Sequence, residues 1–220
     1  MRDERQGSRF LRPRREPERS GAGSCLGAGA DDPRGLLYWL CTDPQAADCI
    51  PPKGIRIRGA RIEGPLDFEG ATLHHWLSLI RCAIPEGIVL TDARTRRIDL
   101  SGSYTQGLDA NGLTVEGDLF LSGLNCTGAA RLMGACIERG LSCRGARLDN
   151  PNGYALIADG MTVGENVLLD ERFHATGAVR LRGARIEGAL VCRGARFENP
   201  NASGIALDPS ECPAWGDRRR

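Results

Sequence analysis

The sequence predicts an all-β fold, a solenoid in which short strands stack in successive coils. Three observations lead to this prediction: a long internal repeat, a regular alternation of apolar residues within it, and a composition of 29 Gly with only 5% aromatic residues in 220. Abundant Leu, Ile, Val and Ala exclude a wholly disordered chain, and the absence of a Gly-X-Y period excludes a collagen-like one. Large rings fit poorly in a thin tube, so this composition suits a narrow core.

The internal repeat is clearest in the second half of the chain. Residues 128–152 read GAARLMGACIERGLSCRGARLDNPN, and residues 177–201, 49 positions further on, read GAVRLRGARIEGALVCRGARFENPN, with 17 of the 25 positions identical. An earlier copy occupies residues 55–73. Repetition with this period indicates a solenoid or a propeller. A propeller blade would have longer, more aromatic strands, so the solenoid is favoured.

Each copy also contains a shorter rhythm. Val179, Leu181, Ala184 and Ile186 form pairs two residues apart, and successive pairs follow about every five residues. Each pair indicates a short strand facing inward. At roughly five residues a side, a four-sided coil takes roughly twenty residues, so the 49-residue unit predicts two coils plus a looped extension. The Asn-Pro-Asn sequences at 150–152 and 199–201 suit that loop.

Glycines recur just before the inward Ala of these pairs, where the chain must turn a corner. A positive φ at such corners would favour Gly. The positions concerned are Gly59, Gly70, Gly134, Gly145, Gly183 and Gly194.

Four short stretches place a small residue two positions before a larger apolar one: Gly-Ala-Arg-Ile-Glu at 59–63 and 183–187, Gly-Ala-Arg-Leu at 145–148 and Gly-Ala-Arg-Phe at 194–197. In this respect the chain resembles the pentapeptide-repeat proteins over about residues 54–208. The resemblance implies a right-handed quadrilateral β-helix. The 49-residue superperiod is similar to that of a divergent bacterial group, some of whose members are labelled membrane-associated oxidoreductases.

The chain is expected to divide into four parts. Residues 1–34 are Arg- and Gly-rich and predict a disordered tail. Residues 35–53 predict a capping helix and linker. The helix is expected over residues 33–41, begun by Asp32-Pro33, and to cover the N-terminal end of the solenoid. The solenoid is expected over residues 54–208, where Pro209 stops it, and residues 209–220 form a tail. The C-terminal end is expected to be weakly capped or to form an end-to-end homodimer.

No residue combination predicts a catalytic, cofactor or metal site. The nine cysteines contain no CxxC pair. Cys143 and Cys192 share a repeat position two coils apart, roughly 10 Å, which is too far for a disulfide. They are expected in the core, as are Cys82, Cys126 and Cys136. The adjacent His74 and His75 point to opposite sides of a strand, and the repeat gives no reason for His174 to approach a cysteine.

Arginine dominates the outward positions, although the net charge is only +1. Interleaved acidic residues favour a solvated wall of ion pairs over a nucleic-acid or acidic-lipid surface. The candidate interaction face contains Arg58, Arg61, Arg131, Arg147, Arg182, Arg185 and Arg196.

The sequence thus predicts a non-enzymatic scaffold or protein-interaction module. A redox enzyme of the labelled type and an Arg-rich anion-binding surface are the alternatives. No apolar stretch approaches the roughly 18 residues of a membrane span. The N-terminus has no apolar signal region, which predicts a cytoplasmic protein, with peripheral membrane association left open.

Overall fold

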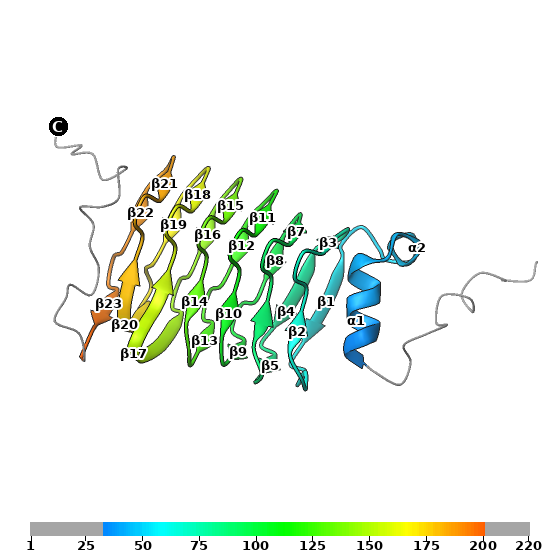
Figure 1. The fold of residues 1–220 in the computed structure, drawn as a ribbon, viewed down its shortest axis with the longest axis horizontal. Helices are drawn as coiled ribbons and strands as arrows, with labels where there is room; N and C mark the ends of the chain where they lie inside the picture. The colour runs from blue at the N-terminus through cyan, green and yellow to red at the C-terminus, as the bar shows by residue number, and fades with distance from the viewer. Residues whose placement is uncertain (1–32, 201–220) are drawn as a thin grey trace, which may run out of the picture.

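A computed structural model describes residues 33–200 as a β-solenoid with two short helices at its N-terminal end (Figure 1). Every strand pair is parallel, and each strand hydrogen-bonds to the equivalent strand of the next turn. The largest consecutive stack has seven strands, which marks about seven turns. The predicted solenoid is therefore confirmed. Both 1–32 and 201–220 lie outside the described residues, so the expectations for the tails, for residues 201–208 and for the C-terminal end are not tested.

Each turn has four sides, named here in the order in which the chain visits them. The first face contains β1 (Ile55–Arg58), β4 (Leu77–Ile80), β8 (Ile98–Asp99), β12 (Leu119–Phe120), β16 (Leu141–Ser142), β19 (Val167–Leu168) and β22 (Leu190–Val191). The second face contains β5 (Ala83–Ile84), β9 (Tyr104–Thr105), β13 (Asn125–Cys126), the first parts of β17 (Arg147–Ile157) and β20 (His174–Arg180), and β23 (Arg196–Glu198).

The remaining two faces complete the tube. The third face contains β2 (Leu66–Asp67), β6 (Ile88–Val89), β10 (Leu108–Asp109), β14 (Ala130–Arg131) and the last parts of β17 and β20. The fourth face contains β3 (Thr72–Leu73), β7 (Arg94–Thr95), β11 (Thr114–Val115), β15 (Cys136–Ile137), β18 (Thr162–Val163) and β21 (Arg185–Ile186). Because the sides follow one another around the tube, the third face lies opposite the first.

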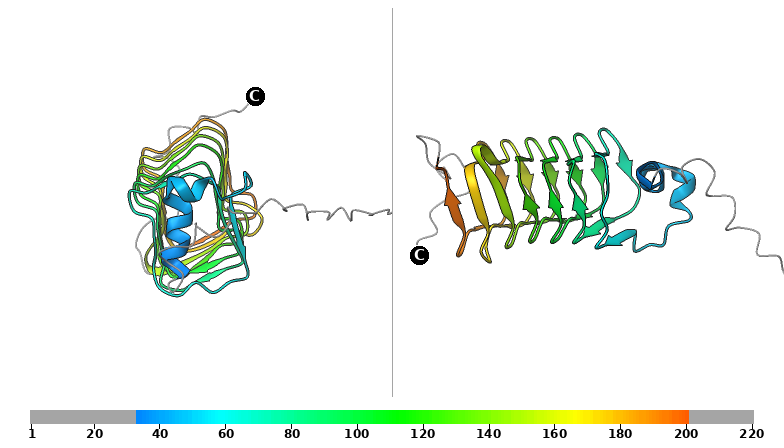
Figure 2. Two further views of the ribbon diagram at one scale, coloured as in Figure 1. Left: turned by 90° about the vertical axis from the view of Figure 1, so that its right-hand side faces the viewer. Right: turned by 90° about the horizontal axis from the view of Figure 1, so that it is seen from below.

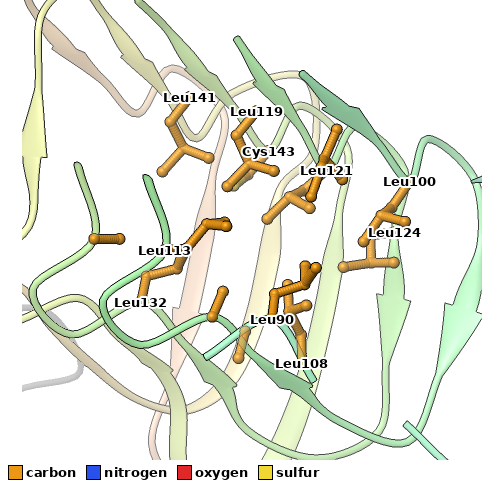
Figure 3. Packing of buried hydrophobic residues seen from close by; sticks show 14 of the residues in the cluster. Leu90, Leu100, Leu108, Leu113, Leu119, Leu121, Leu124, Leu132, Leu141 and Cys143 are labelled. Carbon is orange, nitrogen blue, oxygen red and sulfur yellow. The ribbon is translucent and has the colours of Figure 1, made fainter. Parts of the chain in front are cut away.

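The core is the lumen of this tube, filled by side chains stacked from turn to turn (Figure 3). On the first face, Leu77, Ile98, Leu119, Leu141 and Val167 follow one another in register, each 2% exposed or less. Alternation along a strand points every second residue into this lumen. Burial of such apolar side chains is worth about 1.5–3 kcal/mol each, which makes stacking the main source of stability.

The 49-residue unit comprises two turns, as the sequence predicts. Leu141 pairs with Val167, 26 residues on, and Val167 pairs with Leu190, 23 residues on. The extra length lies in residues 150–153, because Asp149 still pairs with Thr176 and the next register pair is Tyr154 with Ala178. The predicted loop is therefore a wide bulge inside β17. The four residues of this bulge lie opposite a single residue of β20, Gly177.

The predicted corner glycines adopt the left-handed backbone that the turns require. All six have φ between +62° and +71°. At five of them a side chain is disfavoured by backbone conformation rather than by space, because an added Cβ would meet nothing within 4 Å; at Gly145 it would also lie 3.2 Å from the carbonyl oxygen of Glu171.

Two helices precede the first turn: α1 (Pro33–Thr42) and α2 (Pro44–Ala47). Helix α1 lies across the open end of the tube (Figure 2). Its Leu37 and Cys41 are 5% and 2% exposed and join the core, and the ring of Tyr38 stacks on that of Phe68 at 5.8 Å. The predicted capping helix is thus present. Within residues 33–200, neither helix is long and apolar enough to cross a membrane.

Candidate interaction surface

The seven candidate arginines are exposed but do not share one face. Three of them occupy a single outward column of the second face, where successive turns place one residue above another. The seven are distributed as follows: Arg58 on the first face; Arg61, Arg147 and Arg196 on the second; Arg131 and Arg182 on the third; and Arg185 on the fourth.

Acidic neighbours accompany many of the arginines. The Nε atom of Arg61 lies 3.6 Å from Glu63, and Arg144 lies between Asp170 at 3.2 Å and Glu171 at 3.3 Å. Exposed pairs of this kind contribute about 0–1 kcal/mol to stability, since water screens them. Where such pairs form, they neutralise the charge of the wall locally.

The first face differs from this charged wall. Beyond Arg56, its outward column runs in register through Ser78, Asp99, Phe120, Ser142, Leu168 and Val191. Three of these side chains are large and apolar, and one is charged. Apolar residues on the outer side of a sheet, with few charges among them, are typical of the centre of a protein interface.

Aromatic side chains and an arginine gather at the edge of the first face. The guanidinium carbon of Arg97 lies 4.5 Å from the ring centroid of Phe120 and 5.3 Å from that of Trp76. Such cation–π contacts hold the three side chains together. Trp76 remains 39% exposed. The cluster therefore presents an ordered aromatic surface to an approaching molecule.

Sequence reasoning missed this surface because it treated outward positions as polar. The available signal was adjacent apolar pairs: where Leu119-Phe120 or Leu190-Val191 occupy one short strand, one member must point outward. We refer to Trp76, Arg97, Phe120, Leu168 and Val191 as the apolar strip.

The cysteines separate into lumenal and surface thiols: Cys41, Cys82, Cys126 and Cys143 are buried, whereas Cys49 and Cys136 are exposed. Cys143 is buried in the lumen, and Cys192 occupies the equivalent position two turns on, as the repeat predicts. The expectation that Cys136 lies in the core is wrong, because Cys136 is exposed. Its neighbours Ala135 and Ile137 take the two inward positions, so alternation points Cys136 outward.

Burial changes the acidity of the lumenal thiols. Burial raises the pKa of both Cys41 and Cys143 to about 12. A raised folded-state pKa stabilises the fold below the ordinary thiol pKa, near 9, and that contribution is lost as the pH rises towards 12. We therefore expect the free energy of unfolding to fall above about pH 9, with a shallower fall in Cys143→Ala.

A thiol reagent provides a second readout of this burial. At pH 8 we expect Cys143 to react only after denaturation, because a buried neutral thiol is both inaccessible and a weak nucleophile. Cys136→Ser should remove one fast-reacting thiol, whereas Cys143→Ala should remove none. Rapid labelling of Cys143 in the folded protein would contradict the lumenal assignment.

The histidines have structural partners. The Nε2 atom of His75 lies 2.9 Å from the carbonyl oxygen of Ala47, which ties α2 to the first turns, and His174 Nε2 lies 3.5 Å from Glu198. The backbone N–H of His74 donates to the carbonyl of Cys41 at 3.0 Å. Residues 33–200 contain no group of three or more His, Cys, Asp or Glu side chains placed to hold a metal ion.

Comparison with known proteins gave no match to a family model, a curated protein or a solved structure. The candidate surface is therefore interpreted from its own chemistry.

Proposed function

We propose that this protein is a pentapeptide-repeat-like scaffold that binds a partner protein through its first face and carries out no catalysis. The observation that supports this proposal best is the apolar strip. Phe120, Leu168 and Val191 point outward from the first face, whereas the outward positions of the other three faces of the solenoid carry mainly charged and polar side chains. Arg97 lies over the ring of Phe120 and also contacts Trp76, and Trp and Arg are residue types enriched in binding hot spots.

The spacing of the apolar side chains along the strip indicates what kind of partner surface would fit it. Successive turns are separated by about 4.8 Å, so Leu168 and Val191 are one such step apart and Phe120 and Leu168 about two. A partner that presents a straight ridge of apolar side chains can contact several turns at once. The strip is poor in charge, so we expect little salt dependence of this binding.

The test combines two substitutions on the strip with matched substitutions elsewhere. A partner is first identified by crosslinking in native cells, and its affinity is then measured with purified proteins. Trp76→Ala and Leu168→Arg should each weaken binding about tenfold or more, because truncating or charging an apolar contact of this kind costs about 1–4 kcal/mol.

Two control substitutions keep this test specific. Tyr104→Ala removes an aromatic ring from the second face that is 39% exposed, the same fraction as Trp76, and Thr162→Arg adds the same charge on the fourth face. Both should bind the partner as the unchanged protein does. Full binding by Trp76→Ala and Leu168→Arg would overturn the assignment. A stoichiometric flavin or nucleotide in the purified protein would instead support the redox alternative.

A further inference from the structure

The third face carries a second feature, a gradient of charge along the solenoid axis. Its outward residues form two columns. Residues of the first column pair in register from one turn to the next, and each residue of the second column lies two positions after the first-column residue of the same turn. The first column is Asp67, Val89, Asp109, Arg131, Ile157 and Arg180, and the second is Glu69, Thr91, Asn111, Met133, Asp159 and Arg182.

The two ends of these columns carry opposite charges. The end nearest the helices carries Asp67 and Glu69, and the far end carries Arg180 and Arg182. At the centre, Asp109 lies directly beside Arg131 in the next turn. The pattern therefore changes sign about a line that runs between β10 and β14.

We infer that two copies of this chain pack third face to third face, with their solenoid axes antiparallel. The two-fold axis runs parallel to the strands and passes between β10 and β14. It places the first turn of one copy opposite the last of these turns in the other copy, the second opposite the last but one, and so on. Such an isologous contact requires a surface that is complementary to itself. It pairs Asp67 with Arg180, Val89 with Ile157, Asp109 with Arg131, Glu69 with Arg182, Thr91 with Asp159 and Asn111 with Met133.

Each of these pairs is chemically compatible. Three are acid–base pairs, and these carry the contact. Arg180 reaches Asp67 while keeping its own ion pair with Asp159 at 2.6 Å. The remaining pairs add little, because the Thr91 hydroxyl donates to Asp109 of its own chain and Ile157 is only 8% exposed. Like charges do not meet within the two columns. In a parallel arrangement, by contrast, Asp67 would face a second Asp67, and Arg180 a second Arg180, which electrostatic repulsion disfavours.

The centre of the face is open rather than filled by the chain's own side chains. A shallow groove of about 300 Å³ is lined by Val89, Gly107, Leu108, Asp109 and Arg131, among others. The contact between Asp109 and Arg131 within one copy is long, 4.0 Å, and both side chains are partly exposed. Both can therefore also contact their counterparts across the two-fold axis.

The size of the face predicts a weak dimer. Six strands spaced by about 4.8 Å extend only about 24 Å, which places the contact at the small end of protein interfaces. Since ion pairs dominate it, the dimer should dissociate where salt shortens the Debye length to about 3 Å. Dimerisation on the third face leaves both first faces pointing away from each other, so the dimer would present two apolar strips.

Charge reversal and its compensation test this pairing on the full-length protein. Dimerisation is measured by sedimentation velocity over a concentration series at low and high salt. Glu69→Arg and Arg182→Glu should each weaken the dimer about tenfold, because the two-fold axis repeats every change. Combined in one chain, they should restore the affinity. Arg185→Glu, on the fourth face in the same turn as Arg182, should leave it unchanged.

Three outcomes would overturn the inference. The first is a monomer at every concentration at low salt. The second is a dimer that neither single reversal weakens, which would point to the C-terminal end or another surface. The third is a double variant that does not recover, with circular dichroism showing that all variants are folded. None of these outcomes bears on the first face, so the proposed function is tested separately.

Discussion

Val163→Asp is expected to lower the free energy of unfolding by about 4 kcal/mol or more, enough to unfold a typical domain of marginal stability. Val163 is 1% exposed and points into the lumen between Ile137 and Ile186 of the adjacent turns. A carboxylate at this position would lose its hydration without gaining a partner of opposite charge, because its neighbours in the stack, Ile137 and Ile186, are apolar.

Thr162→Asp is the matched control because it introduces the same side chain one residue earlier. Thr162 lies on the outer side of the same strand, β18. Its replacement should change stability by no more than about 0.5 kcal/mol. Urea unfolding followed by far-ultraviolet circular dichroism compares the two variants. Similar midpoints would contradict the inward and outward alternation from which the surfaces are derived.

Gly177→Ala is expected to lower stability by about 3 kcal/mol or more and the melting temperature by about 6 °C or more. Gly177 has a φ of +120°, a conformation that side chains rarely adopt. A Cβ at this position would overlap the carbonyl oxygen of Asn150 and lie 2.9 Å from that of Gly153. Both contacts are with backbone, so the wide bulge of β17 would have to move.

Gly183→Ala, in the same turn, isolates the effect of the bulge. Gly183 has a φ of +66°, and a Cβ there would meet nothing within 4 Å. This variant should lose only the left-handed strain, about 1–2 kcal/mol. Thermal unfolding distinguishes the two: equal losses would mean that residues 150–153 do not pack on Gly177.

The repeat made the solenoid predictable because one local rule applies in every turn. A small residue two positions before a larger one, as in Ala184 and Ile186, gives two inward side chains, and the preceding Gly183 turns the corner. Each of these signals lies within five residues of the next. The fold class therefore needed no knowledge of distant contacts.

The faces were less predictable because stacking depends on turn length. Registered residues are 20 to 27 positions apart: Ile88 pairs with Leu108, and Arg147 with His174. A five-residue count cannot show where the longer turns occur. It could not assign Arg61 and Arg182 to different faces, nor reveal that Asp67 and Arg180 end one column. The apolar strip escaped notice for a different reason, because outward positions were expected to be polar.

Labelling of exposed aromatic side chains, in native cells and in the purified protein, tests most directly whether the first face binds a partner. Trp76 and Tyr104 are each 39% exposed on different faces, so each serves as the reference for the other. If the apolar strip is occupied, Trp76 is protected in cells and labelled in the purified protein, while Tyr104 is labelled equally in both. Equal labelling of Trp76 in the two settings, or protection of Tyr104 alone, would contradict the proposed function.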